Sequence, residues 1–118
     1  MNMVNSEDGT KIAFDKVGKG PAVILVAGAL SARLSWSGHG LPELLAPHFT
    51  VYNYDRRGRG DSGDAKPYTV QREIEDIKAL IDEAGGESYL YGHSSGGALA
   101  LEAALKLSDK VKKLLRDA

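Results

Sequence analysis

The sequence predicts an α/β fold, because strand-like and helix-like segments alternate along the chain. Residues 22–26 form a continuous apolar run, which is typical of a strand that is buried on both faces of a sheet. Residues 69–84 carry apolar side chains at helical spacing and charged side chains on the opposite face. An apolar run at 89–91 follows, and an Ala/Leu-rich run begins at Ala98. The order strand, helix, strand, helix indicates a sheet covered by helices.

The amino-terminal segments predict an antiparallel hairpin. Residues 10–17 largely alternate between polar and apolar side chains, which indicates a half-exposed strand. Residues 1–5 are its expected partner, because the turn signal Glu-Asp-Gly at 7–9 lies between the two segments. The Gly-Lys-Gly-Pro segment at 18–21 then breaks the chain before the buried strand at 22–26.

The middle of the chain predicts a short helix, a strand and an irregular loop. The helix lies around 41–46, where Pro42 is tolerated in the first turn. Residues 49–54 form the strand. The loop at 55–67 contains three glycines that permit tight geometry, and we interpret it as scaffold. Asp55 and the arginines that follow it can hold this loop by charge-assisted hydrogen bonds.

The remaining elements begin at Thr69, the expected N-cap of the amphipathic helix. This helix stops at Gly85-Gly86, and residues 88–91 form the next strand. The Ala/Leu-rich helix then runs to about Leu107. Residues 111–115 predict at most a frayed or edge strand, because charged residues surround the apolar ones.

The pentapeptide Gly92-His93-Ser94-Ser95-Gly96 lies directly between a predicted strand and a predicted helix. A serine hydroxyl acts as a nucleophile only where it projects clear of its backbone, and a sharp strand-to-helix turn achieves this. Such a turn requires small residues two positions before and two positions after the serine, because the strand and helix backbones nearly touch. Gly92 and Gly96 meet that requirement. The placement of the motif, more than its letters, predicts a nucleophile elbow.

With these motifs in hand, the chain resembles the amino-terminal half of an α/β-hydrolase-fold enzyme of the small esterase-like kind found in bacteria. Three motifs stand in the order of that family: Ala-Gly-Ala-Leu at 27–30, Asp-Arg-Arg-Gly-Arg-Gly-Asp-Ser at 55–62, and the elbow. The resemblance implies a single domain over residues 1–118. It also implies a truncated α/β-hydrolase fold with three-layer αβα architecture and a mostly parallel, twisted sheet.

The resemblance assigns roles to three residues of this sequence. Ser94 would be the nucleophile in the hydrolysis of a small ester, and the backbone N–H groups of Ser95 and Ala29 would form the oxyanion hole. Such donors stabilise the negative oxygen that develops during acyl transfer. Ala27 stands where the family usually has a histidine, so a side chain that would orient the oxyanion loop is missing.

The catalytic histidine is the residue that this pattern lacks. In enzymes with this elbow the acid and the histidine follow the serine in the chain, but no histidine follows Ser94 here. His93 adjoins the serine on a tight turn and should point elsewhere, and His48 lies at the wrong end of its strand. His39, which follows the oxyanion loop, is the one credible substitute base. We therefore expect an incomplete triad with weak or no activity.

Two alternatives remain open at this stage. The chain could be a competent minimal esterase whose base comes from His39 or from a partner chain. It could instead be a noncatalytic folding unit or interaction module that uses the loop at 58–62 or an open sheet edge. A sheet that ends early exposes such an edge, which favours self-association as a homodimer. The charged ending at 110–118 fits a clipped or engineered terminus.

Composition narrows the classes of partner and compartment. The 118 residues, 42% of them hydrophobic, fit one small domain, and a net charge of −1 argues against electrostatic binding of nucleic acid or membrane. The absence of cysteine excludes disulfides and thiolate metal sites. We also expect no metal and no cofactor. The polar segment at 1–9 shows no signal peptide, and we expect a cytoplasmic protein that acts on a small-molecule ester.

Overall fold

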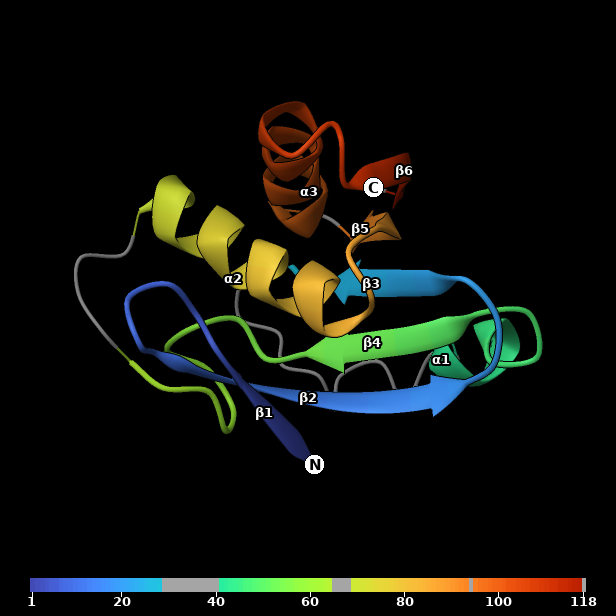
Figure 1. The fold of residues 1–118 in the computed structure, drawn as a ribbon, viewed down its shortest axis with the longest axis horizontal. Coiled ribbons are helices and arrows are strands. Elements are labelled where there is room, and N and C mark those ends of the chain that lie inside the picture. The colour runs from blue at the N-terminus through green and yellow to red at the C-terminus, as the bar shows by residue number, and fades with distance from the viewer. Residues whose placement is uncertain (29–40, 65–68, 94, 118) are drawn as a thin grey trace.

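Figure 1 shows the fold in a computed structural model that describes residues 1–28, 41–64, 69–93 and 95–117. The strands are β1 (Asn2–Asn5), β2 (Lys11–Gly18), β3 (Ala22–Val26), β4 (Thr50–Tyr54), β5 (Ser88–His93) and β6 (Val111–Asp117). The helices are α1 (Leu41–Leu45), α2 (Val70–Glu83) and α3 (Ser95–Lys106). Strands and helices alternate from β3 onward, which confirms the α/β class.

The described strands form one six-stranded sheet in the order β1-β2-β4-β3-β5-β6. β3 lies between β4 and β5 and runs parallel to both, and β6 runs parallel to β5. β1 and β2 form the predicted antiparallel hairpin, and β2 pairs antiparallel with β4. The sheet is mixed but mostly parallel, because a helix-containing crossover joins each pair of successive strands from β3 to β6.

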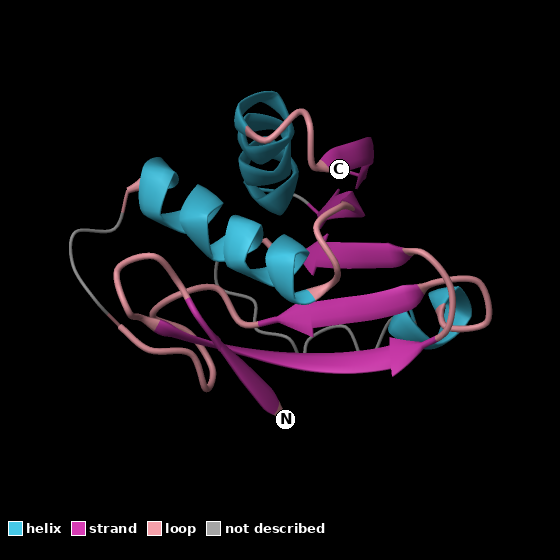
Figure 2. Ribbon diagram, in the orientation of Figure 1, coloured by secondary structure: helices cyan, strands magenta, loops and turns pink. Residues whose placement is uncertain are grey.

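Helices cover both faces of this sheet, which gives the expected three layers (Figure 2). The residues of β3 alternate between the faces. Ile24 and Val26 belong to the larger core cluster, which α2 and α3 cover. Val23 and Leu25 belong to the smaller cluster on the opposite face, where Leu41 of α1 packs. This two-sided burial is the physical reason that residues 22–26 read as a continuous apolar run.

Helix α2 has the boundaries that its sequence predicts. The side chain of Thr69 caps the helix by accepting a hydrogen bond from the backbone N–H of Arg72. Gly85 and Gly86, with φ of 110° and 106°, end it in a conformation that favours glycine. The buried side chains all lie at helical spacing, and the apolar ones are Ile74, Ile77, Leu80 and Ile81.

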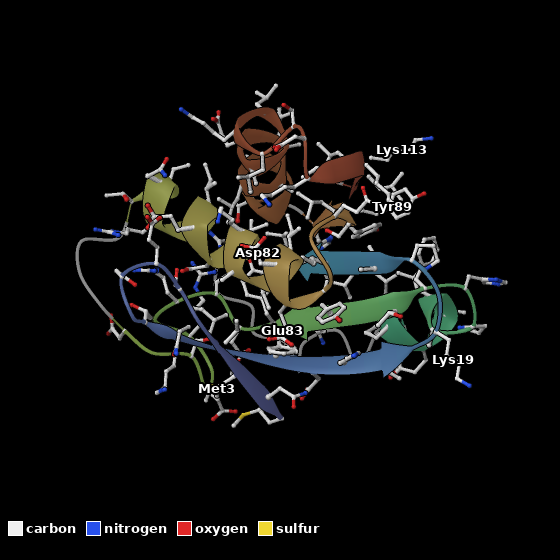
Figure 3. The ribbon with its side chains drawn as sticks, in the orientation of Figure 1. Met3, Lys19, Asp82, Glu83, Tyr89 and Lys113 are labelled. Atoms are coloured by element: carbon white, nitrogen blue, oxygen red, sulfur yellow. The ribbon has the colours of Figure 1, made fainter. Side chains whose placement is uncertain are left out.

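Strand β6 is longer than the sequence predicts and lies at one edge of the described sheet. The β5–β6 ladder has an irregularity between Ser88 and Tyr89, after which Tyr89 pairs with Lys113 (Figure 3). The ammonium of Lys112 lies 5.8 Å from the ring centre of Tyr89. Charged side chains therefore do not prevent this pairing, because the backbone makes the ladder and Leu114 packs against the larger core cluster.

None of the helices in the described part of the chain is long and apolar enough to cross a membrane.

Candidate active site

The predicted elbow lies between β5, which ends at His93, and α3, which begins at Ser95. A single residue, Ser94, therefore separates the strand from the helix. Ser94 itself lies outside the described residues, and so do Ala29 and His39. The geometry of the site is consequently defined here by the segments that flank these three residues.

The two glycines of the elbow lie where backbones meet. A Cβ atom on Gly92 would lie 2.6 Å from the Cα of Gly97 and 2.7 Å from the carbonyl oxygen of Gly96. A Cβ atom on Gly96 would overlap the carbonyls of Val26 and Ala27 at the end of β3. Both clashes involve backbone atoms, which cannot move aside as a flexible side chain could. This confirms the prediction that these two positions require the smallest residue.

The end of β3 lies beside the elbow because β3 and β5 are neighbouring parallel strands. Their register pairs Val26 with Gly92, so the carboxyl-terminal ends of the two strands lie side by side. Helix α3 starts at this end of the sheet, and its first turn contains no acidic residue. The N–H groups of the first turn of a helix point toward its start, where they favour negative charge. Ser95 is the first residue of that turn.

Two arginines of the loop after β4 bind consecutive carbonyls at the end of β3. Arg56 donates from Nη1 to the carbonyl oxygen of Ala27 at 3.2 Å. Arg59 donates from Nη1 to the carbonyl oxygen of Gly28 at 3.3 Å. Arg56 also forms a two-pronged ion pair with Glu73 of α2, with N–O distances of 2.8 and 2.9 Å. The loop therefore connects α2 to the chain segment that leads into residue 29.

Arg57 ties the same loop to the hairpin turn and to α2. Its guanidinium binds both carboxylate oxygens of Asp76, at 2.8 and 2.6 Å, and both of Asp8, at 2.9 and 3.3 Å. The side chains of Arg57 and Asp76 are each only 1% exposed. The hydrogen bond from Arg57 is the main reason that the pKa of Asp8 lies well below its usual value. These bonds confirm that charge-assisted contacts hold the loop.

Asp55 fixes the second half of the loop from a fully buried position. Its carboxylate accepts a hydrogen bond from the backbone N–H of Asp61 at 2.8 Å, and its carbonyl accepts one from the hydroxyl of Ser62. Gly60 adopts a φ of 52° and passes so close that a Cβ atom there would overlap the Asp55 carboxylate. The loop thus acts as the scaffold that the sequence predicts.

Of the described histidines, His48 lies at the end of the sheet that the sequence predicts. His48 is exposed and precedes β4, so it lies at the end of the sheet opposite the elbow. His93 is half-buried as the last residue of β5. Glu102 on α3 and Asp109 after it are exposed to solvent. Among the described residues, no group of three or more His, Cys, Asp or Glu could hold a metal ion.

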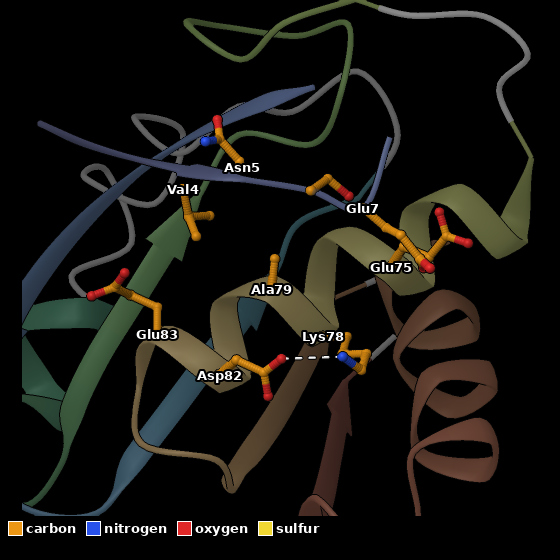
Figure 4. A pocket seen from close by; sticks show the side chains of 9 residues that line it. Val4, Asn5, Glu7, Glu75, Lys78, Ala79, Asp82 and Glu83 are labelled. Carbon is orange, nitrogen blue, oxygen red and sulfur yellow. Dashed lines mark hydrogen bonds and ion pairs between the residues drawn. The ribbon is translucent and has the colours of Figure 1, made fainter. Parts of the chain in front are cut away.

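A groove of about 500 Å³ lies between the β1–β2 hairpin and α2 (Figure 4). Its lining carries four carboxylates and one ammonium, and Lys78 pairs with Asp82 at 3.2 Å. The lining residues are Val4, Asn5, Ser6, Glu7, Glu75, Lys78, Ala79, Asp82 and Glu83. None of them belongs to β3, β5, α3 or the loop after β4. The groove is therefore separate from the elements that carry the motifs.

Sequence reasoning found the arginines but not their partners. Arg57 and Asp8 lie 49 positions apart, and Arg57 and Asp76 lie 19 positions apart. No local pattern links residues at such separations. The same holds for the contacts of Arg56 and Arg59 with the end of β3, which depend on the order of the strands.

Comparisons with known proteins agree with this geometry. Residues 23–115 match the model of the Alpha/beta hydrolase family. An alpha/beta hydrolase from Sphaerobacter thermophilus superimposes with a TM-score of 0.90 at 54% identity, covering 98% of this chain and 44% of that one. A thermophilic esterase from Thermogutta terrifontis gives a TM-score of 0.86 at 29% identity, covering 98% and 44%.

A curated relative gives the same result at the level of sequence. N-formylmaleamate deformylase from Pseudomonas putida is 37% identical over 101 residues, which are 83% of this chain and 37% of the relative. The chain thus spans less than half the length of each of these three proteins.

Proposed function

Because the chain belongs to the α/β hydrolase family, we propose that it carries the nucleophile and the oxyanion hole of a serine hydrolase acting on small esters. One observation supports this most strongly: the backbones of β5, α3 and the end of β3 converge at Gly92 and Gly96. A serine placed between that strand and that helix projects its hydroxyl at the edge of the sheet. The relatives named as an esterase and a deformylase also favour attack on a carbonyl carbon.

The proposed reaction begins when the Oγ of Ser94 attacks the carbonyl carbon of the ester. The carbonyl oxygen becomes negative, and the backbone N–H groups of Ser95 and Ala29 stabilise it by hydrogen bonds. Collapse of this intermediate expels the alcohol, which takes up a proton, and leaves the acyl group on Ser94. Water then releases the acid and restores the hydroxyl.

The proton of the Ser94 hydroxyl requires an acceptor, and this is where the proposed site is incomplete. No histidine follows Ser94 within the 118 residues. The acceptor is then His39 or a group supplied from outside this sequence. Loss of one triad member costs on the order of a millionfold in turnover, while an oxyanion hole and binding retain roughly a thousandfold over water. We expect weak turnover or none from these 118 residues alone.

Labelling with a fluorophosphonate, followed by intact-mass measurement, tests the proposal. Addition of one label per chain, faster than in heat-denatured protein and abolished in Ser94→Ala, is the expected result. Ser95→Ala is the matched control, because it removes the neighbouring hydroxyl and keeps the backbone N–H. Labelling of the wild type no faster than of heat-denatured protein would refute the proposal. His39→Ala then identifies the base: an unchanged labelling rate removes His39 from the mechanism.

A second candidate function is self-association through the sheet edge, and the position of β6 favours it. Among the described strands β6 pairs with β5 alone, and its Leu115 is 45% exposed. An edge strand of this kind can pair with a second copy of the chain. Light scattering should then give the mass of a dimer at micromolar concentration, and Ser94→Ala should leave that mass unchanged. A monomer under these conditions would argue against this function.

A further inference from the structure

Two guanidinium groups from another part of the chain bind residues 27 and 28, which directly follow β3. Arg56 binds the carbonyl of Ala27, and Arg59 binds the carbonyl of Gly28. Both arginines come from the loop after β4, and Glu73 of α2 anchors Arg56. Arg56 is buried and Arg59 is half-buried, so the contact of Arg56 is shielded from competing water and that of Arg59 is shielded in part. The two carbonyls are consecutive in the chain and directly precede the proposed oxyanion donor.

The carbonyl of Gly28 and the N–H of residue 29 belong to the same peptide unit. A peptide unit is planar and almost always trans, so its C=O and N–H point in opposite directions. A donor that fixes the carbonyl therefore also fixes the direction of the N–H. A cation on the carbonyl oxygen further polarises the amide, which strengthens the N–H as a donor.

The position of Arg59 is electrostatically costly, which indicates that the carbonyl contact offsets a penalty. Burial, first, and the positive charge of Arg56, second, lower the pKa of Arg59 below its usual value. A hydrogen-bond acceptor at a fixed position stabilises a charged guanidinium there. Gly28 provides that acceptor at 3.3 Å.

We propose that Arg59 is a positioning residue for the oxyanion hole: it holds the Gly28 carbonyl so that the N–H of the same peptide unit faces the reacting carbonyl oxygen. Arg56 holds the preceding unit in the same way. This inference rests on the proposed function, because the donor in question is the N–H of Ala29.

The first test is independent of activity. In a two-dimensional ¹⁵N–¹H NMR spectrum, Arg59→Gln should move the amide resonance of residue 29, because the hydrogen bond at the carbonyl of that peptide unit is lost. Arg72→Gln is the matched control: it removes the same charge from α2, where Arg72 pairs with Glu75 at 2.8 Å. The control should leave the resonance of residue 29 in place. An unchanged resonance in Arg59→Gln would overturn the proposal.

The second test uses the labelling rate of Ser94. Complete loss of an oxyanion donor costs roughly 100- to 1,000-fold in rate, so a misdirected donor should cost about 10- to 100-fold. Arg59→Gln should therefore label about 10- to 100-fold more slowly, whereas Arg72→Gln should label at the wild-type rate. Equal rates in Arg59→Gln and the wild type would overturn the proposal. If Arg59→Gln does not fold, Arg59→Met retains the apolar stem without a donor and carries the same expectations.

The two tests separate failure of the inference from failure of the proposed function. A wild type that is not labelled refutes the role of Ser94, but the resonance of residue 29 still reports whether Arg59 orients that peptide unit. A shifted resonance then supports the positioning role, and an unshifted one overturns it.

Discussion

Replacing Gly96 with alanine should destabilise the protein, although alanine is the better helix former. Gly96 lies in the first turn of α3, where a Cβ atom would overlap the carbonyl oxygens of Val26 and Ala27 and lie 2.8 Å from the carbonyl carbon of Ala27. These are backbone atoms of β3 and of the residue after it. They cannot yield without shifting the strand or the helix.

The magnitude follows from two opposing effects. Overpacking of a tight site costs typically 1–3 kcal/mol, and a backbone obstacle places Gly96→Ala near the upper end, at about 3 kcal/mol. The gain in helix propensity from glycine to alanine is about 1 kcal/mol. The free energy of unfolding should therefore fall by about 2 kcal/mol. Because the added methyl group separates α3 from β3, labelling of Ser94 should slow as well.

Urea unfolding followed by circular dichroism measures the difference. Gly63→Ala is the matched control, because a Cβ atom there would lie 3.2 Å from a methyl group of Thr10 and 3.3 Å from the backbone oxygen of Lys11, contacts that a shift of a few tenths of an ångström relieves. The control should change the free energy of unfolding by less than 1 kcal/mol. A Gly96→Ala variant as stable as the wild type would show that α3 and the end of β3 are not in backbone contact.

Three further predictions concern the residues that hold the scaffold. Arg57→Gln should lower the free energy of unfolding by about 3–5 kcal/mol in urea, because it leaves the buried charge of Asp76 unpaired. Asp8 has a lowered pKa in the folded state, so the stability it contributes is complete above its usual value of 3.8 and is lost as the pH falls below it. Asp8→Asn should therefore flatten the acid limb of a stability-versus-pH curve, and an unaltered limb would contradict this. Thr69→Ala should cost about 1 kcal/mol by removing the N-cap of α2, whereas Thr69→Ser should retain most of it.

The elements that could be predicted from the sequence are those whose signals are local. Helix α2 combines helical spacing with Thr69 at its start and Gly85 at its end, and all three agree with the structure. The elbow glycines could be predicted because a strand-to-helix turn imposes the same steric demand wherever it occurs. The strand β3 could be predicted because burial on both faces removes every polar residue from its sequence.

The features that could not be predicted depend on contacts between distant segments. β4 lies between β2 and β3 in the sheet, although it follows both in the chain. This order brings the loop that starts at Asp55 beside the end of β3. The extension of β5 to His93 has the same origin, because β3 and β6 pair with its last residues.

The carbonyl of Ala27 is the point at which these separate constraints meet. Gly96 approaches it from α3, and Arg56 binds it from the loop after β4. Glu73 of α2 holds Arg56 in turn, so three elements far apart in the chain position one peptide group. A rigid support of this kind favours catalysis by preorganised backbone donors, since such donors act only if they do not have to reorient during the reaction. The carboxyl-terminal end of β3, which lies beside the elbow, is therefore held in place where the proposed oxyanion hole requires it.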